Sequence, residues 1–471
     1  MGRAAATEAG ADGTDAEGGV TLADLSAVHE RLVRNDQRVI LHPLLSDEVR
    51  DRVVIVSGRG CRLRDAAGRE YLDATGGLWL AQVGHGRAEL AEKAAEQMRR
   101  IEYFTSFWEF TNEPAIRLAD RLVSIAPDGI ARAYFTSGGS EGDDAAIKMA
   151  RLYFHRRGQP ERTWILSRNG AYHGCAYGGG SATGLDVYRE GFGPLLPDVH
   201  HLTPPWPYRT DLFDGRDPTD FLIDELEAAI DRIGPDHVAA FIGEPVMGVA
   251  GMLVPPVDYW PRVQAVLRRH GILLILDEVV TAYGRIGEWF AAQHYGLEPD
   301  IIVTAKGISS GYVPLGANLL TEEVAGTLAS CGGFPHGYTY NGHPTACAVG
   351  LANLDIIERE SLLEAAQTVG AYLLGRLREL EDIEVVGEVR GIGMMFGIEL
   401  VSDRAARTPL PSPSVPLPDV LRRETGVIIR NCAHSLVLSP PLVLTHSEAD
   451  RIVEALRLVL GRVRPNGELL A

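Results

Sequence analysis

Two neighbouring stretches of the sequence decide the fold, ILLILDEVVTAYGR at residues 272–285 and DIIVTAKGISSGYVPLG at residues 300–316. Each opens with a short run of Ile, Leu and Val that ends at polar residues, a pattern typical of a strand buried on both faces. Comparable runs occupy residues 131–136, 163–167 and 238–244, and helical stretches such as 141–157 and 259–271 lie between them. Strands that alternate with helices predict an α/β fold with a mostly parallel sheet covered on both faces.

The pattern divides the chain into four segments. Residues 1–20 contain little that could be buried, so we expect a disordered tail. Residues 21–75 combine a helical stretch with short strands, and we expect them to pack with a smaller C-terminal domain. The alternating pattern fills residues 76–344, the expected large domain, whereas residues 345–471 have the helices and paired strands of a smaller α+β domain.

Composition excludes several classes of partner. The 471 residues carry a net charge of −18, which would repel nucleic acids and anionic membranes. No apolar run approaches the roughly 20 residues of a membrane helix, and the first residues, MGRAAATEAG, lack the apolar core of a secretory signal. Five scattered cysteines, and histidines without a third ligand nearby, indicate neither a disulfide framework nor a metal site. We therefore expect a cytoplasmic protein without a bound metal.

The basic residues show a strong bias that makes one lysine conspicuous. Of 45 basic residues only Lys93, Lys148 and Lys306 are lysines, and the rest are arginines. Arginine does not deprotonate in proteins and cannot act as an amine nucleophile. Lys93 and Lys148 lie in helical patterns and are interpreted as surface residues. Lys306 directly follows a buried strand and has no obvious carboxylate neighbour, so burial and nearby cations are expected to lower its pKa and leave a reactive amine.

Two acids end other strands of the same sheet. Asp277 follows the apolar residues 272–276, and Glu244 closes the strand at 238–244. Ligands of open α/β sheets bind beyond the carboxyl ends of the strands, so these acids and Lys306 are expected to meet there. A buried Asp277 is costly unless it is paired. Its partner could be Arg285 or the cationic ring nitrogen of a cofactor.

The segment TSGGSEGDDAAIKMAR at residues 136–151 follows a strand and opens a helix. Gly138 and Gly139 allow close approach of the backbone, and Ser140 with the free N–H groups of the helix forms a possible phosphate site. Residues 138–142 also match G-x-S-x-G, the nucleophile elbow of α/β hydrolases, with Ser140 as the nucleophile. In NGAYHG, residues 169–174, Tyr172 could cover a flat cofactor or serve only in packing.

Taken together, these motifs resemble those of the class III, fold type I pyridoxal-phosphate aminotransferases over roughly residues 30–460. The family pattern SGSEANDxAIKxAR corresponds to SGGSEGDDAAIKMAR, and counterparts of the Y-H-G, E-P-V-x-G, D-E-V-x-T-G-F-G-R-x-G, K-G and H-x-x-T-x-x-G-H-P blocks follow in the same order. The resemblance implies a PLP fold type I architecture, pyridoxal 5′-phosphate as cofactor and transfer of an amino group from an amine or amino acid to a keto acid.

The resemblance also implies a role for each matching residue. Lys306 would form the Schiff base with the cofactor and later move the proton, Asp277 would pair with the pyridine nitrogen, and Tyr172 would stack on the ring. Gly139 and Ser140 would bind the phosphate, Glu244 would lie near the cofactor, and Thr339 would bind the phosphate of the neighbouring subunit in a homodimer or a dimer of dimers.

Two further stretches resemble the amino acid:pyruvate, or ω-amine, subgroup. They are DATGGLWLAQVGHGR at residues 73–87 and GVIIRNCAHSLVLSPPL at residues 426–442. By this resemblance Trp79 would line the substrate pocket, and Arg430 would be a mobile arginine that binds the substrate carboxylate. Pyruvate is the plausible acceptor.

The chain departs from the family pattern at a few positions. Gly138 replaces Ser, Gly142-Asp143 replaces Ala-Asn, Met247 replaces Gln, and Ala282-Tyr283 replaces Gly-Phe. These differences affect substrate preference rather than reaction type. Three alternatives remain on the sequence alone: a PLP decarboxylase, mutase or racemase of the same fold, an α/β hydrolase using Ser140, and a PLP-binding transcription regulator, which would need a basic DNA-binding appendage.

Overall fold

The computed structural model describes residues 22–45, 52–413 and 416–470, so the predicted tail at residues 1–20 lies outside the described residues. The described residues form two compact units, one of residues 22–45, 52–57 and 63–70, and one of residues 58–62, 71–413 and 416–470. The first unit holds helix α1 (Leu22–Val39) and parts of strands β1 (Ile55–Arg59) and β2 (Arg62–Asp65). Within it, the Asp36 carboxylate lies 2.8 Å from His42 Nε2 and accepts a hydrogen bond from Arg52 Nε at 3.1 Å. The domain boundaries at residues 75/76 and 344/345 stay predictions.

The second unit is built around a seven-stranded sheet. Its strands run in the order β4-β10-β9-β8-β7-β5-β6. Their bounds are β4 (Ile130–Thr136), β5 (Trp164–Arg168), β6 (Val199–Leu202), β7 (Val238–Gly243), β8 (Leu273–Asp277), β9 (Ile301–Thr304) and β10 (Gly316–Thr321). Strand β10 is antiparallel to both neighbours, and the pairs from β9 to β6 are parallel. The predicted mostly parallel α/β sheet is confirmed, and β6 and β10 are additions that the apolar runs did not indicate.

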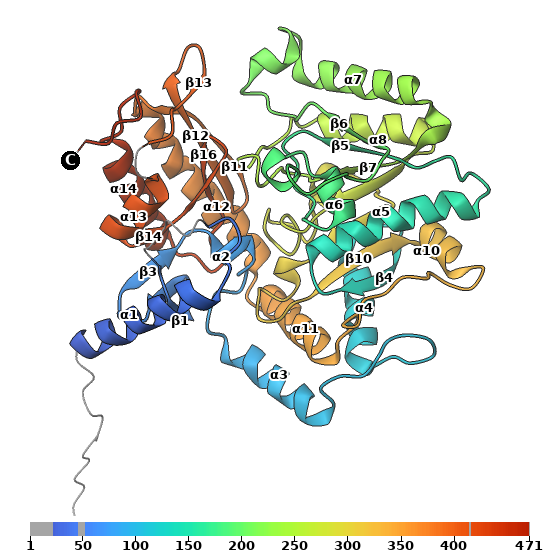
Figure 1. Ribbon diagram of the computed structural model, residues 1–471, viewed down its shortest axis with the longest axis horizontal. Coiled ribbons are helices and arrows are strands. Elements are labelled where there is room, and N and C mark those ends of the chain that lie inside the picture. Colours follow the sequence, from blue (N-terminus) through green and yellow to red (C-terminus); the bar gives the residue numbers. More distant parts are fainter. Residues whose placement is uncertain (1–21, 46–51, 414–415, 471) are drawn as a thin grey trace, which may run out of the picture. The chain divides into compact units, whose positions relative to one another are not determined.

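The two faces of the sheet bury alternate residues of each strand, as the period of two requires. On one face Leu273 and Ile275 join a core formed largely by α5 and α10. On the other, Leu274 and Leu276 join the larger core that α7 and α8 contribute to. Figure 1 shows α5 running across the sheet. The helices of this part are α2 (Gly76–Trp79), α3 (Ala88–Arg100), α4 (Glu113–Ile125), α5 (Gly139–Arg156), α6 (Tyr177–Ala182), α7 (Pro218–Ile233), α8 (Tyr259–Arg269), α9 (Ala291–Tyr295), α10 (Glu322–Ala329) and α11 (Pro344–Arg359).

The C-terminal part of the unit contains an antiparallel sheet in the order β11-β12-β16-β15, with β13 paired to β12. Its elements are α12 (Leu362–Arg378), β11 (Val386–Ile392), β12 (Met395–Asp403), β13 (Thr408–Pro409), α13 (Leu417–Thr425), β14 (Val427–Ile428), β15 (Arg430–Cys432), β16 (Ser435–Leu438) and α14 (His446–Leu460). The short 3-10 helices of the chain are η1 (Asp186–Tyr188), η2 (Thr210–Phe213), η3 (Pro235–His237), η4 (Lys306–Ile308) and η5 (Glu379–Asp382).

One strand pair connects this C-terminal part to the segment that carries Trp79. Strand β3 (Glu70–Asp73) pairs in parallel with β14, so that Leu72 lies opposite Val427 and Asp73 opposite Ile428. The chain leaves β3 toward Trp79 and leaves β14 toward Arg430. Among the described residues, no helix combines the length and the apolar character needed to cross a membrane.

Candidate active site

Three polar residues gather at the carboxyl ends of neighbouring parallel strands. Glu244 follows β7, Asp277 ends β8, and Lys306 comes shortly after β9. In the register of the sheet Asp277 lies opposite Val303 of β9. Lys306 follows Val303 by three residues, just beyond the end of that strand. The expectation that these side chains share one edge of the sheet is thus met by the strand order and register.

Asp277 is only 4% exposed and pairs with a histidine rather than with Arg285. Its Oδ2 lies 2.8 Å from Nδ1 of the buried His173, and its Oδ1 accepts a hydrogen bond from the Val279 N–H at 3.0 Å. The suggested Arg285 partner is wrong, because the Arg285 guanidinium donates to the Pro440 carbonyl instead. Burial lowers the pKa of Arg285 to about 9.

The amine of Lys306 is set up as a nucleophile by its surroundings. Removal from water lowers the pKa of Lys306 to about 8; Asp277 and Glu244 oppose this shift, and the guanidinium groups of Arg430 and Arg285 add to it. The expectation that Lys306 has no carboxylate neighbour is wrong, yet burial outweighs both acids. Lys306 also has a backbone φ of +48°, an uncommon conformation outside glycine.

The other two lysines are surface residues. Lys93 forms an ion pair with Glu96 at 2.9 Å with more than half of its side chain exposed, and Lys148 lies on the exposed side of α5.

Glu244 is buried and takes part in two backbone hydrogen bonds. Its Oε1 accepts from the Tyr172 N–H at 3.1 Å, and its Oε2 accepts from the Gly248 N–H at 2.9 Å. Burial raises the pKa of Glu244. The carboxyl group therefore fixes the loop that carries Tyr172 at the edge of the sheet.

The N-terminus of α5 lies at this edge as well. Gly138 precedes the helix, and a Cβ added to it would meet no atom within 4 Å, which leaves open space in front of the first turn. Gly139 and Ser140 are the first two helical residues. Ser140 is not among the residues with positive φ, in contrast to the strained turn of a nucleophile elbow. The geometry is that of a helix N-terminus open to an anion.

Two tyrosines stand beside one another next to this cluster. The ring of Tyr172 lies 5.0 Å from the ring of Tyr188, which ends the 3-10 helix η1, and the Tyr172 hydroxyl lies 3.3 Å from Cys175 Sγ. Burial raises the pKa of Tyr188, and the nearby Arg430 guanidinium opposes the shift. Tyr188 belongs to no recognised motif, so sequence analysis alone could not identify it.

The ring of Trp79 lies close to two cations. The Lys306 amine is 5.2 Å and the Arg430 guanidinium carbon 5.3 Å from its ring centre. Trp79 is 2% exposed, has a φ of +61°, and its indole N–H has no partner within the described part of the chain. Among those residues no carboxylate forms an ion pair with Arg430. The two residues predicted for substrate binding are therefore brought together beside Lys306.

Thr339 is placed differently. It is exposed, and its carbonyl oxygen accepts a hydrogen bond from the Tyr103 hydroxyl at 2.7 Å. In the described residues no hydrogen bond joins the Thr339 side chain to the other predicted site residues of its own chain. A role in a neighbouring subunit's site stays a prediction.

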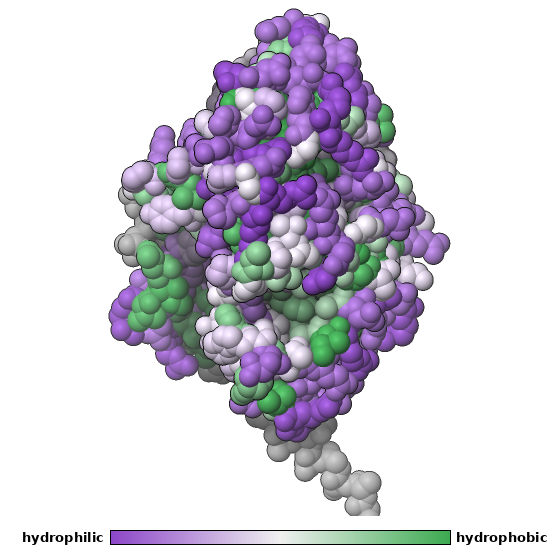
Figure 2. Space-filling model, turned by 90° about the vertical axis from the view of Figure 1, so that its right-hand side faces the viewer, coloured by the Kyte–Doolittle hydropathy of each residue, from purple (hydrophilic) through white to green (hydrophobic). Residues whose placement is uncertain are grey.

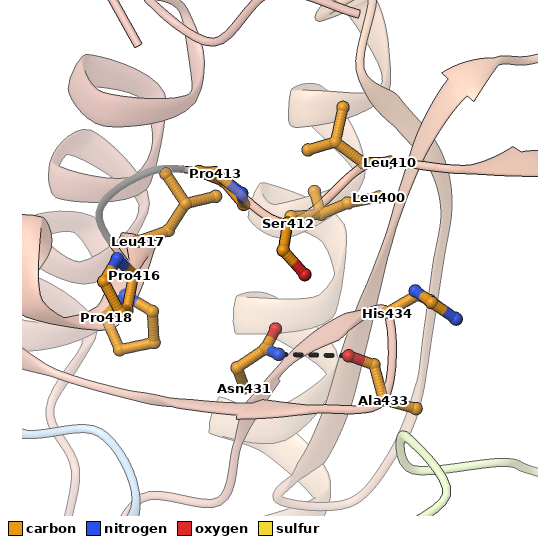
Figure 3. A pocket seen from close by; sticks show the side chains of 10 residues that line it. All are labelled: Leu400, Leu410, Ser412, Pro413, Pro416, Leu417, Pro418, Asn431, Ala433 and His434. Carbon is orange, nitrogen blue, oxygen red and sulfur yellow. Dashed lines mark hydrogen bonds between the residues drawn. The ribbon is translucent and has the colours of Figure 1, made fainter. Parts of the chain in front are cut away.

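A separate pocket of about 190 Å³ lies in the C-terminal part, between β12, the start of α13 and the turn after β15 (Figure 3). Its wall is mostly apolar, and the Asn431 amide donates to the Ala433 carbonyl at 3.0 Å across one side. None of the predicted site residues lines it. It is therefore not the cofactor site predicted from the motifs.

Comparison with known proteins identifies the class. The family model for aminotransferase class-III matches residues 45–460. The putrescine–pyruvate aminotransferase of Pseudomonas aeruginosa is 37% identical over 86% of this chain and 90% of its own length, and the diaminobutyrate–2-oxoglutarate transaminase of Halomonas elongata is 37% identical over 92% and 97%. The chain belongs to the class-III aminotransferase family, and it is a PLP-dependent transaminase.

Solved structures agree with this assignment. An (S)-enantioselective ω-transaminase from Thermomicrobium roseum is 48% identical, with a TM-score of 0.87 over 90% of this chain and 97% of the other. An amine transaminase from an uncultivated Pseudomonas species, solved with PLP bound, is 43% identical, with a TM-score of 0.86 over 89% and 97%. The predicted PLP fold type I architecture and the resemblance to ω-transaminases are confirmed, and the hydrolase alternative is ruled out by the family.

The residues at the sheet edge suit pyridoxal 5′-phosphate as a ligand. They offer a lysine amine of lowered pKa, a buried carboxylate at Asp277 and open space before the helix N-terminus at Gly138. These are the three groups that the aldehyde, the ring nitrogen and the phosphate of this cofactor need. The chemistry of the site and the family assignment therefore agree.

Proposed function

We propose that the enzyme transfers an amino group from a primary amine or amino acid to a small α-keto acid, with pyruvate as the preferred acceptor. The pairing of Trp79 and Arg430 beside the Lys306 amine carries this proposal. A flat apolar wall suits the side chain of an amine, and a guanidinium suits the carboxylate of a keto acid. The named relatives that use pyruvate or 2-oxoglutarate support a keto acid acceptor.

Each residue at the sheet edge is assigned a task in this reaction. When bound, the cofactor supplies a carbonyl carbon that accepts the amino group and a ring that withdraws electrons from the donor. Lys306 would hold the cofactor through its amine. Once the donor nitrogen has displaced it, the free neutral amine would take a proton from the substrate carbon and pass it to the carbonyl-derived carbon of the cofactor, and it would move a proton the opposite way with the acceptor. Asp277 holds the proton on the ring nitrogen.

The remaining contacts orient the cofactor. The first turn of α5, with Gly139 and Ser140, binds the phosphate through backbone N–H groups and a hydroxyl. Tyr172 covers one face of the ring, and Tyr188 supports Tyr172 from the side. Glu244 holds the Tyr172 backbone in place. Apart from Tyr188 in η1, these groups follow the carboxyl ends of β4, β5 and β7.

Arg430 is assigned to bind the carboxylate of the acceptor. When an apolar amine binds instead, its guanidinium is expected to move out of the pocket. A charge that stays buried without a partner is strongly unfavourable, so one pocket can serve both substrates only if the guanidinium moves. Arg430 is half-buried, begins a three-residue strand, and is soon followed by Ala433 with a φ of +49° in a turn. A short strand at the start of a turn suits such movement.

A homodimer, or a dimer of dimers, completes the proposed site by supplying Thr339 to the phosphate of the partner subunit. The segment that contacts Thr339 exposes large apolar side chains: Phe104 is 47%, Trp108 84% and Phe110 43% exposed, and Tyr340 is 61% exposed. Exposed aromatic residues of this kind favour an interface. Figure 2 shows one face of the molecule with separate groups of hydrophobic residues among hydrophilic ones.

A cytoplasmic location is proposed for the enzyme. All five cysteines are free thiols in the structure, and three of them, Cys61, Cys347 and Cys432, are buried. Free cysteines suit a reducing compartment.

The assay that tests the function is a donor–acceptor screen on the holoenzyme. Amines, diamines and amino acids are each paired with pyruvate or 2-oxoglutarate, and the amino acid formed from the acceptor is measured. Alanine formed from pyruvate with a simple amine donor is the expected result. Activity confined to release of carbon dioxide or to racemisation would contradict the proposal.

A further inference from the structure

The proposed mechanism assigns no task to the buried acid Asp143. Asp143 lies in the first turns of α5 and is only 2% exposed. Its Oδ1 is buried and has no hydrogen-bond partner within the described part of the chain. A buried ionised carboxylate without a partner is strongly unfavourable, so the protonation state of Asp143 has to be explained.

Asp143 belongs to a compact cluster with the acid that faces the ring nitrogen. One carboxylate oxygen of Asp143, one ring nitrogen of His173 and one carboxylate oxygen of Asp277 all lie within 4.8 Å of one another. Within the cluster the hydrogen bond between His173 Nδ1 and Asp277 Oδ2, at 2.8 Å, is formed, whereas His173 Nε2 is buried without a partner among the described residues. Nδ1 of His173 is thus occupied by its hydrogen bond with Asp277.

The charges that face Asp143 are mostly negative. Asp277, Glu244 and Asp144 are the carboxyl groups around it, and Lys306 is the nearby amine. Burial and then the three carboxyl groups raise the pKa of Asp143 well above its ordinary value, and Lys306 opposes them only weakly. Two carboxylates this close in a buried site do not both ionise, since one proton relieves the repulsion.

We propose that Asp143 is the protonated partner of Asp277, a neutral carboxylic acid that keeps the single negative charge of the pair on Asp277. The inference rests on the proposed function, because it gives that charge a purpose opposite the pyridine nitrogen of the cofactor. Asp143 acts through Asp277 and is therefore a positioning residue rather than a catalytic one.

The matched variants are Asp143→Asn, a neutral residue of the same shape and the one found in the family pattern, and Asp144→Asn as a control. Asp144 is the next residue along α5, is half-buried, and accepts a hydrogen bond from the Gly179 N–H at 2.8 Å. Infrared difference spectra of holoenzyme labelled with ¹³C-aspartate report protonated carboxyl groups directly. Spectra are recorded well above pH 6, where the half-buried Asp300, whose pKa is raised to about 6, is ionised and adds no band of a protonated acid.

The proposal predicts a carbonyl stretch of a protonated aspartic acid in the wild-type spectrum. The band is lost in Asp143→Asn and kept in Asp144→Asn. The visible spectrum of the bound cofactor is expected to be the same in wild type and Asp143→Asn at neutral pH, and only the wild type changes when Asp143 ionises at higher pH. Asn has nearly the same shape as Asp. If Asp143 served only in packing, the visible spectra of wild type and Asp143→Asn would therefore not differ at any pH.

Three results would overturn the proposal. One is loss of carboxylate bands, rather than of the protonated band, in Asp143→Asn, and another is absence of the protonated band from the wild type, which is decisive even if the variant does not fold. The third is a change of the cofactor spectrum on treatment with a chelator, which would place a cation in the cluster. PLP content and attachment to Lys306 are measured on the same samples, so that failure of the proposed function is recognised separately.

Discussion

Arg430 and Trp79 form a cation–aromatic pair, with the guanidinium carbon 5.3 Å from the centre of the indole ring. The Lys306 amine lies 5.2 Å from the same ring. The indole thus contacts both the residue assigned to the substrate carboxylate and the residue assigned to the reacting carbon.

The first prediction concerns Arg430→Ala. Loss of a charge-assisted contact to the acceptor carboxylate is expected to cost about 2–4 kcal/mol of transition-state binding with pyruvate. The half-reaction with an apolar amine is expected to change little, because that donor has no carboxylate. Single-turnover kinetics with each substrate measure the two effects. Arg423→Ala on the exposed side of α13 is the control, and equal losses with amine and keto acid would show that Arg430 is only structural.

The second prediction concerns Asp277→Asn. The variant is expected to bind PLP through Lys306 and the phosphate site, whereas kcat falls by roughly 10²- to 10⁴-fold because the ring nitrogen loses the group that holds its proton. PLP content and kcat are measured together. Asp300→Asn removes a half-buried carboxyl group, which accepts a hydrogen bond from the Leu274 N–H at 2.8 Å, and should not lower kcat in this way. Loss of PLP with unchanged kcat per bound cofactor would make Asp277 an anchor only.

The third prediction is a pH dependence. With a pKa lowered to about 8, the Lys306 amine of the apo protein becomes neutral, and hence reactive, as pH rises through about 8 instead of the ordinary lysine value near 10.4. Competitive acetylation read by mass spectrometry gives the midpoint, with Lys93 and Lys148 as references. Arg430→Ala removes a cation and should raise the midpoint, whereas Asp277→Asn removes an anion and should lower it. A midpoint near 10 in wild type would contradict this description of the site.

The fourth prediction concerns the shared site. A Lys306→Ala protein and a Thr339→Ala protein are mixed under conditions that allow subunit exchange. If Thr339 reaches the partner's phosphate, each heterodimer has one site lacking both residues and one intact site, so about a quarter of all sites recover. Activity well above that of the two separate proteins is expected. Confirmed exchange without a gain in activity would show that Thr339 does not act across the interface.

Much of this arrangement could be predicted from the sequence. The apolar runs located β4, β5, β7, β8 and β9 within one or two residues, because strands buried on both faces leave a simple signal. Asp277 and Lys306 could be placed at one edge because parallel strands share a direction. The apolar runs do not reveal β6 and β10. The sequence of β6, VHHL, is polar, and in that of β10, GANLLT, the only large apolar residues are two adjacent leucines.

The side-chain partners could not be predicted in the same way. His173 is visible in its motif, but its pairing with Asp277 depends on the packing of a loop against the end of β8, 104 residues further along the chain. Tyr188 lies in a short 3-10 helix without a motif, and its position beside Tyr172 comes only from the tertiary fold. The absence of a carboxylate near Lys306 was inferred from local sequence, whereas Asp277 and Glu244 approach it from neighbouring strands.

The central claim is that Lys306 is the residue to which the cofactor attaches. Reduction of the holoenzyme with borohydride followed by peptide mass spectrometry tests it directly, because the chain offers only three lysines as attachment sites. A phosphopyridoxyl group on Lys306 alone is expected, together with its loss, and loss of transamination, in Lys306→Ala. The group on Lys93 or Lys148, or transamination at a near-normal rate in Lys306→Ala, would contradict the account.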